Sequence, residues 1–394
     1  MTELVNAYDW QRLEASASEP VLVSDNETLA DYCGYWQTLP MVALDTEFQR
    51  VETFYPISGL IQLADDRACY LIDPLEITDF DPLKALFTNT RVLKVMHAVS
   101  EDLELFLTSL EVLPAPIYDT QVAAAFLDWG FSMGLQRMLQ HALGVELKKH
   151  ETTSDWLQRP LTKSQEHYAA LDVAYLPAIC LKQKAALEEK GMLGWLQQES
   201  DALLRQAVDE DPEGLHYYKR FTQMWSLPKH KIAALRDLTA WREQVSRTRD
   251  VPRNRILRNQ ALLEIVTAWP STVYELSAVD DIKRKIIRAD GQTILAFLKN
   301  AQQSAEDNPP EAILKPLPFF WNQHLKHLKA LVRNRAAELG VAQEILFRRK
   351  EMDALIRSGM SDGNYRMPDA VSVWRQDAVG PVLLAALNEI EKQR

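Results

Sequence analysis

The order of hydrophobic patterns along the chain most restricts how it can fold. Between residues 20 and 97, five short apolar runs alternate with polar breaks, a spacing typical of strands in a sheet. The runs are Pro20–Val23, Met41–Leu44, Leu60–Leu63, Cys69–Ile72 and Arg91–Met96. From Ser100 onward the apolar spacing becomes helical, and helices are expected over 100–109, 119–128, 134–143 and 163–190. A sheet followed by packed helices predicts an α/β domain.

Two polar breaks divide the rest of the chain. The run 209–214 is acidic and turn-rich, and the run 302–310 is polar and ends in two prolines. The chain of 394 residues is also longer than an ordinary domain with a single core. We therefore predict an α/β domain over 1–208, helical domains over 212–301 and 317–394, and a linker over 302–316. A faint repeat links the helical domains, since each has a leucine-spaced basic helix and then an Ile-Leu pair, Ile256-Leu257 and Ile345-Leu346.

Composition favours a protein that stays in the cytoplasm. The chain starts without a basic, apolar leader, and no apolar run approaches about 18 residues, so we expect neither export nor a membrane partner. Cys33, Cys69 and Cys180 are widely spaced, which fits neither a disulfide framework nor a C-x-x-C zinc or redox motif.

Charge is distributed unevenly. The net charge is −11, but residues 219–299 carry 16 Lys and Arg against 8 Asp and Glu, a local +8 that leaves −19 elsewhere. The negative average argues against a protein that coats nucleic acid by bulk charge, whereas this one segment is suited to an anion.

Four acidic residues stand where packing alone does not explain them. Asp45 and Glu47, at i and i+2 on the second expected strand, should leave the same face roughly 6–7 Å apart. Asp102 lies in the first turn of a helix that follows a later strand. Tyr168 and Asp172 lie about 40° apart around the helix expected from Thr162 or Ser164 onward. Each position alone has an ordinary structural explanation: an exposed edge strand, a charge at a helix start, or a surface pair.

Together these carboxylates indicate a metal site. Four converging carboxylates repel one another unless cations neutralise them. Two divalent cations about 3.5–4 Å apart would do so and would also support in-line displacement at phosphorus. Oxygen ligands favour Mg²⁺ or Mn²⁺ over zinc. A tyrosine hydroxyl is better suited to orienting a water molecule than to deprotonating it.

With these residues in this order, the chain resembles the DEDD exonuclease superfamily, and closely its bacterial ribonuclease D family. The resemblance covers nearly the whole chain. Its N-terminal motifs are Leu44-Asp45-Thr46-Glu47-Phe48, Tyr55-Pro56, Gly59-Leu60-Ile61-Gln62-Leu63, His97-Ala98 and Glu101-Asp102-Leu103. The later motifs are Tyr118-Asp119-Thr120-Gln121, Asp155-Trp156-Leu157-Gln158-Arg159-Pro160-Leu161 and Tyr168-Ala169-Ala170-Leu171-Asp172-Val173.

The resemblance implies a ribonuclease H-like α/β fold and removal of 5′-mononucleotides from a free 3′-hydroxyl end. It implies that Asp45, Glu47 and Asp172 hold one metal ion, and that Asp45 and Asp102 hold the second, Asp102 partly through water. All four acidic positions of the family motif are occupied here. The implied substrate is RNA, tRNA precursors above all, and the chain is expected to act as a monomer.

The water-orienting group has two candidates, because residues 167–172 also fit the H-x-A-x-x-D pattern of the superfamily's histidine branch. On an unbroken helix His167 lies about 140° from Asp172, whereas Tyr168 lies about 40° away, which favours the tyrosine. Gln62 and His97 are candidate RNA contacts, and His97 is expected to be a strand-end hydrogen bonder more than a ligand. Asp119 is expected to cap the helix that opens at Thr120.

The helical domains resemble HRDC domains, the small helical units that ribonuclease D shares with RecQ helicases. In the first, a basic segment over 247–255 is expected to lie in a loop and to bind RNA phosphates through Arg249, Arg253 and Arg255, with Lys283-Arg284-Lys285 adding charge. The alternative is a solvated helix face. The second domain matches less well and carries mixed charge.

Two other functions stay open. The same site occurs in DNA 3′ exonucleases, although the chain carries no G-x-x-x-x-G-K-[ST] motif of a helicase. An inactive RNA-binding scaffold that keeps the carboxylates as a structural metal site is the third interpretation.

Overall fold

The runs predicted as strands form a mixed sheet in the computed structural model, which describes residues 8–146, 154–208 and 211–393. The strands are β1 (Val21–Val23), β2 (Met41–Gln49), β3 (Ile57–Ala64), β4 (Cys69–Ile72), β5 (Leu93–Met96) and β6 (Ile117–Asp119). Their order is β1-β4-β3-β2-β5-β6, so β2 lies inside the sheet between antiparallel β3 and parallel β5. The sequence did not predict β6, because three residues are too few to show an alternation.

Helices make up most of the remaining described chain. Up to the end of the first 208 residues they are α2 (Trp10–Ser16), α3 (Asn26–Trp36), α4 (Asp81–Thr88), α5 (Ser100–Leu110), α6 (Thr120–Phe126), α7 (Leu135–Leu143), α8 (Lys163–Ala174), α9 (Leu176–Glu189) and α10 (Leu193–Ala207). Beyond them are η1 (Tyr217–Arg220), η2 (Thr222–Met224), α11 (Lys229–Thr248), α12 (Arg253–Ile256), α13 (Asn259–Ala268), α14 (Val273–Leu276), α15 (Arg284–Asp307), α16 (Phe320–Leu339), α17 (Gln343–Leu346), α18 (Arg349–Gly359) and α19 (Val373–Lys392).

The single helix predicted over 163–190 is two helices. It divides at Tyr175, which ends α8 and precedes α9. Pro177 lies in the first turn of α9, where its missing N–H costs nothing, whereas inside a continuous helix it would lose a backbone hydrogen bond. Tyr168 and Asp172 both precede the division, so they lie on one unbroken helix.

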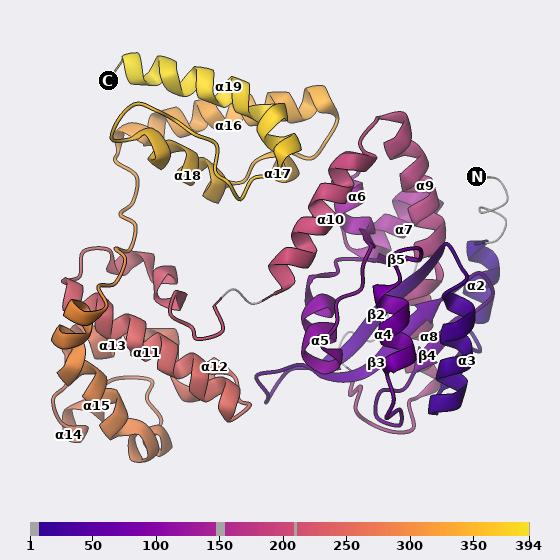
Figure 1. Cartoon of the computed structure of the whole chain (residues 1–394), viewed down its shortest axis with the longest axis horizontal. Coiled ribbons are helices and arrows are strands. Elements are labelled where there is room, and N and C mark those ends of the chain that lie inside the picture. Colours follow the sequence, from indigo (N-terminus) through magenta and orange to yellow (C-terminus); the bar gives the residue numbers. More distant parts are fainter. Residues whose placement is uncertain (1–7, 147–153, 209–210, 394) are drawn as a thin grey trace. The chain divides into compact units, whose positions relative to one another are not determined.

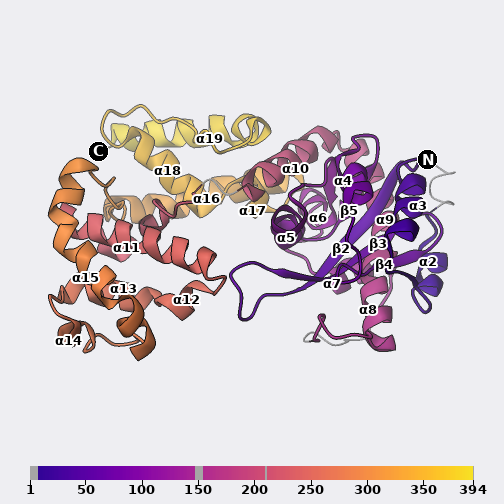
Figure 2. The ribbon, with the colours of Figure 1, turned by 60° about the horizontal axis from the view of Figure 1, so that its bottom comes forward.

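Two layers of helices cover the sheet (Figures 1 and 2). Val42 and Leu44 of β2 share one core with Trp36 of α3 and Phe106 of α5, while α8 packs on β2, β3 and β4. Because side chains alternate along a strand, the odd-numbered residues of β2, Asp45 and Glu47 included, face α8. The even-numbered residues face α5.

The described chain forms two compact units that cross the predicted domain boundaries. Unit 1 contains residues 1–49, 57–208 and 318–394, and unit 2 contains residues 50–56 and 209–317. The last helical domain therefore groups with the α/β domain, and the β2–β3 connection groups with the first helical domain. Of the predicted breaks, Asp209 and Glu210 lie outside the described residues, and α15 runs through Asp307, so helix occupies the first part of the expected linker.

Direct contacts attach the last helical domain to the α/β domain within unit 1. The rings of Trp374 (α19) and Trp195 (α10) stack with their centroids 4.8 Å apart. Glu199 of α10 accepts hydrogen bonds from Ser372 Oγ at 2.6 Å and from Trp374 Nε1 at 2.8 Å. Trp374 is buried and Trp195 is half-buried, so the ring stack and the hydrogen bonds to Glu199 join α19 to α10.

In unit 2, α11 packs against α13 and α15 around a core that includes Leu235, Leu262 and Leu298. The faint repeat has a structural counterpart: a 20-residue helix and then a four-residue helix occur in both helical domains, as α11 with α12 and as α16 with α17. Both Ile-Leu pairs are buried. Among the described residues, no helix combines the length and apolar character needed to span a bilayer.

Candidate active site

Asp45 and Glu47 lie on β2, which pairs with β3 at both positions but with β5 only at Met41–Ala43. They are therefore not on an edge strand, although only one neighbouring strand borders them. In the β2–β3 register Asp45 is opposite Gln62 and Glu47 is opposite Leu60, and the register shifts directly after Glu47. Both carboxylates are half-buried on the face covered by α8. Ionised groups on such a face need a compensating charge or hydrogen bonds.

Asp102 approaches from the other face of β2. It is 7% exposed in the first turn of α5, and its carboxylate accepts a hydrogen bond from the hydroxyl of Thr46, which lies between Asp45 and Glu47. Thr46 was not predicted to be part of the site. A threonine flanked by two acidic residues on a buried strand was the available signal, because a buried hydroxyl needs a partner.

Asp119 positions the helix that carries Asp102. Its side chain caps α6 at Gln121 N, 2.8 Å away, as predicted, and it also accepts from Ala98 N at 3.1 Å and Val99 N at 3.2 Å. Ala98 has a φ of 59°, a left-handed conformation that costs energy for alanine. The buried Asp119 carboxylate stabilises this turn and thereby fixes where α5 begins.

Helix α8 presents Tyr168 and Asp172 to the same side. The helix runs unbroken from Lys163, begins at a capping box formed by Thr162 and Gln165, and carries a hydrogen bond between Tyr168 and Asp172. His167 points elsewhere, because its Nδ1 lies 2.9 Å from the carbonyl oxygen of Ala17. This geometry supports the tyrosine rather than the histidine as the residue beside the acidic groups.

The four acidic groups interact electrostatically. Burial, and then repulsion from Asp102, Asp172 and Glu47, raises the pKa of Asp45 well above its usual range. Burial, and then repulsion from the carboxylates of Asp172 and Asp102, raises the pKa of Glu47 to about 8. Burial raises the pKa values of Asp102 and Asp172 to about 7, although hydrogen bonds from Thr46 and Tyr168 act in the opposite direction. In the part of the chain that is described, no three such groups are gathered closely enough to hold a metal ion as they stand.

These raised pKa values predict how stability depends on pH without metal. A carboxyl whose pKa is raised by folding favours the folded state at low pH, and that stability is lost as pH rises through about 7 to 8. In EDTA, we expect the midpoint of thermal unfolding to fall between about pH 6 and about pH 9, and to fall less in Asp102→Asn. Equal slopes in parent and variant would contradict the assigned effect of burying the Asp102 carboxyl.

A short loop supports Tyr168 from the side. The Trp156 ring lies 6.2 Å from the Tyr168 ring, and Gln165 Nε2 donates to Asp155 O at 3.0 Å. Arg159 anchors the same loop, since it forms an ion pair with Asp73 and donates to Gly59 O at 2.7 Å. The loop therefore fixes the position of the tyrosine ring.

Gly59 allows this loop to come close to β3. A Cβ at position 59 would lie 2.7 Å from Trp156 Cβ and 2.8 Å from Trp156 O. We expect Gly59→Ala to displace the loop and to lower the turnover number about ten- to a hundredfold, since small misplacements of positioning groups are costly. Gly34→Ala is the matched control, because no atom lies within 4 Å of its added Cβ. Similar turnover in the two variants, each checked for folding by circular dichroism, would remove the loop's assigned role.

Gln62 and His97 are buried with unused polar atoms. Neither amide atom of the fully buried Gln62 has a partner, and its side chain shares a sheet face with Asp45. His97 Nδ1 lies 2.8 Å from Thr120 Oγ1, as expected for a strand-end hydrogen bonder, whereas its Nε2 has no partner. Burial lowers the pKa of His97, which keeps the ring neutral. Both groups remain candidate contacts to a bound ligand.

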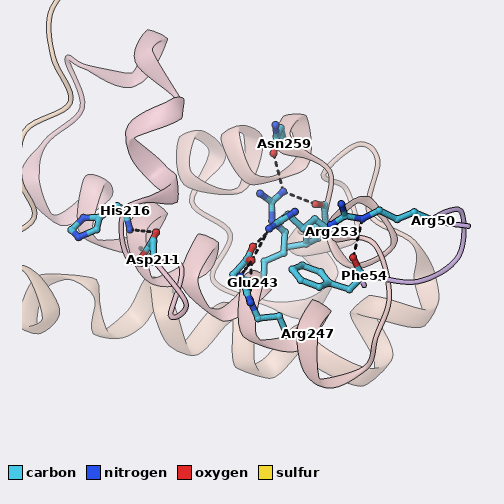
Figure 3. Close-up of polar contacts among 10 residues, drawn as sticks. Arg50, Phe54, Asp211, His216, Glu243, Arg247, Arg253 and Asn259 are labelled. Atoms are coloured by element: carbon cyan, nitrogen blue, oxygen red, sulfur yellow. Dashed lines mark hydrogen bonds and ion pairs between the residues drawn. The ribbon is translucent and has the colours of Figure 1, made fainter. Parts of the chain in front are cut away.

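The arginines predicted to bind RNA are already paired within unit 2. Arg249 forms a bidentate pair with Asp290, and Arg253 and Arg255 pair with Glu243 and Glu52. Figure 3 shows Glu243 shared between Arg253 and Arg247, with the Phe54 ring beside both. The expected loop over 247–255 is also partly helical, since α11 ends at Thr248 and α12 begins at Arg253. The RNA-binding role of these three arginines stays a prediction.

The chain matches known proteins along nearly its whole length. Residues 20–188 match the 3′-5′ exonuclease family and residues 232–298 match the HRDC domain. Ribonuclease D of Pseudomonas paraeruginosa is 40% identical over 95% of this chain and 99% of its own length. Ribonuclease D of Escherichia coli is 34% identical over 93% of this chain and 98% of its own. The crystal structure of the Escherichia coli enzyme, described as an exoribonuclease involved in structured RNA processing, covers 94% of this chain and 99% of its own at a TM-score of 0.86 and 33% identity.

A ribonuclease H-like sheet with acidic residues on β2, α5 and α8, followed by an HRDC domain, defines a 3′-to-5′ exoribonuclease. The chain belongs to the ribonuclease D family. RNA is its substrate class.

Proposed function

We propose that Asp45, Glu47, Asp102 and Asp172 hold two divalent cations, Mg²⁺ or Mn²⁺, at which the 3′-terminal phosphodiester bond of RNA is hydrolysed. The observation that carries this proposal is the set of four acidic groups whose pKa values are raised by burial, with repulsion from the other carboxylates adding to the shifts of Asp45 and Glu47. Cations would relieve that repulsion, and hard oxygen donors suit these two metals.

The donor chemistry fits such ions. The four groups are carboxylates, and the buried Gln62 amide opposite Asp45 has both polar atoms unused, so it can bond to water or a phosphate oxygen at the site. When bound, divalent cations lower the pKa of a coordinated water and stabilise charge on phosphate oxygens. For Asp102 to join the other three, its hydrogen bond with Thr46 must loosen or be kept through only one oxygen.

Each side chain of the proposed site has a separate role. Asp45 and Glu47 are fixed by an interior strand, and Asp172 is fixed by a helix that packs on that strand. Tyr168 hydrogen-bonds with Asp172, and burial raises the pKa of its hydroxyl, so the group keeps its proton and can orient a water molecule. Gln62 and His97 contact the terminal nucleotide.

The substrate is RNA with a free 3′-hydroxyl end, tRNA precursors above all, and the products are 5′-mononucleotides. The description of the Escherichia coli enzyme as acting in structured RNA processing supports this class. The protein acts as a monomer. Its described cysteines are all free and buried, which is consistent with the reducing cytoplasm expected from the sequence.

A comparison of RNA and DNA tests the substrate class. Matched 3′-hydroxyl RNA and DNA strands, and one RNA blocked by a 3′-phosphate, are incubated with the protein and Mg²⁺ or Mn²⁺. We expect the 3′-hydroxyl RNA to be shortened faster than the DNA, and the blocked RNA to persist. Faster shortening of DNA would favour the alternative that the protein trims DNA ends.

A further inference from the structure

Unit 2 contains a basic depression that the active site does not use. It lies beside η1, α11 and α12, and its volume is about 500 Å³. The polar side chains that line it are Tyr217, Arg242, Arg253, Asn254, Arg258 and Asn259. We call it the arginine pocket. No acidic residue lines it, so its lining offers hydrogen-bond donors and positive charge to an anion.

Arg242 lines the arginine pocket and is only 2% exposed. Its Nη1 donates to Leu257 O and to Asn259 Oδ1, each at 2.8 Å, and neither acceptor is charged. Its Nε has no partner among the described residues. A guanidinium that is buried with neutral acceptors is costly, and an anion in the pocket would offset its charge.

Arginine side chains around the Tyr217 ring add positive charge at the arginine pocket. The guanidinium carbons of Arg220, Arg242 and Arg253 lie 4.7, 4.8 and 5.6 Å from the centroid of that ring. Glu243 neutralises part of this charge, through Arg253 and Arg247, and is the central carboxylate in Figure 3. The aromatic ring allows like-charged groups to lie near one another, which raises the positive potential.

The exposed side chains at the rim of the arginine pocket can change their partners. Arg258 is exposed and pairs with exposed Asp281 at 2.9 Å, a surface pair that is weak and readily exchanged for another anion. Asn254 is also exposed at the rim. The pocket thus combines a fixed, buried cation with donors that can close over a ligand.

We propose that the arginine pocket binds a phosphate group of a nucleotide, either a backbone phosphate of the RNA substrate or that of a free mononucleotide. A planar guanidinium with parallel N–H donors matches phosphate oxygens, and asparagine amides add donors. The proposal rests on the RNA-directed function above. It adds Arg242 and Arg258 to the arginines of unit 2 that are predicted to contact an anion.

Binding of a fluorescent single-stranded RNA to the full chain, in an Asp45→Asn background and in EDTA, tests the proposal without turnover. Arg242 is buried and its replacement can unfold the unit, so the rim variants Arg258→Ala and Asn254→Ala carry the test. We expect the double rim variant to weaken binding about tenfold and to lower the slope of log K against log salt by about one. Arg288→Ala, an exposed arginine of α15 outside the pocket, is the matched control, with an expected loss below about twofold.

A second variant is expected to strengthen RNA binding rather than weaken it. Asp281→Asn removes the carboxylate that competes for Arg258, and it should tighten RNA binding, which a purely structural pocket would not do.

A competition experiment separates the two possible sources of the phosphate, RNA and a free mononucleotide. Displacement of RNA by adenosine 5′-monophosphate or inorganic phosphate indicates a free phosphate site, and displacement by RNA alone indicates a backbone contact. Equal losses in the rim variant and in Arg288→Ala, with no gain in Asp281→Asn, would overturn the proposal. Normal RNA binding by a parent chain that degrades no RNA would instead count against the proposed function.

Discussion

Asp45→Asn and Asp102→Asn are each expected to lower the rate of RNA hydrolysis by roughly a thousandfold, which corresponds to about 4 kcal/mol of transition-state stabilisation. Asp45 is repelled by all three of the other carboxylates, and Asp102 approaches from the second face of β2. An amide keeps the shape of the carboxylate but not its charge, so cation binding should be lost while the fold remains.

The matched control for Asp102→Asn is Glu101→Gln. Glu101 occupies the neighbouring position in the first turn of α5 and is exposed, so its loss should leave the rate within about twofold. In EDTA the Asp102→Asn chain should unfold at the parent's temperature or above it, because the pKa of Asp102 is raised by burial. A large loss of rate in Glu101→Gln would point to a general charge effect, and no loss in Asp102→Asn would contradict the proposed role of Asp102 as a ligand.

Tyr168→Phe should lower the turnover number about a hundredfold with little change in KM, within the range typical for a positioned acid–base group. The change removes the hydroxyl that hydrogen-bonds with Asp172 and leaves the ring that packs beside Trp156. His167→Ala should change the rate by less than about threefold, because the imidazole bonds to the carbonyl of Ala17. A greater loss in His167→Ala than in Tyr168→Phe would assign the water-orienting role to the histidine branch.

The parts of the site that were predictable are those set by local pattern. Asp45 and Glu47 were placed on one face because strand alternation has a period of two, and Tyr168 beside Asp172 because the Thr162 cap fixes where α8 begins. The Thr46–Asp102 hydrogen bond joins residues far apart in the chain, and no local rule predicts it. The division at Tyr175 had a local signal in Pro177, which the helical periodicity outweighed.

The net positive charge of residues 219–299 was predictable from the sequence, but the partners in the ion pairs were not. The excess of Lys and Arg over 219–299 is evident in the sequence, yet Arg249, Arg253 and Arg255 each meet a carboxylate, one of which is Glu52 in the β2–β3 connection. Likewise, mixed charge in the last helical domain gave no indication of the Trp374–Trp195 stack that attaches it to the α/β domain. Such pairings depend on tertiary packing, which sequence spacing does not encode.

The most direct test of the central claim is the product formed from a 3′-hydroxyl RNA labelled at its 3′-terminal nucleotide, with Mg²⁺ or Mn²⁺ and then with excess EDTA. The four-carboxylate site predicts that the label appears as a 5′-mononucleotide from the earliest time point, that EDTA stops its release, and that added metal restores it. Release of the label in longer fragments, or unchanged release in EDTA, would contradict a metal-dependent 3′-to-5′ exonuclease at Asp45, Glu47, Asp102 and Asp172.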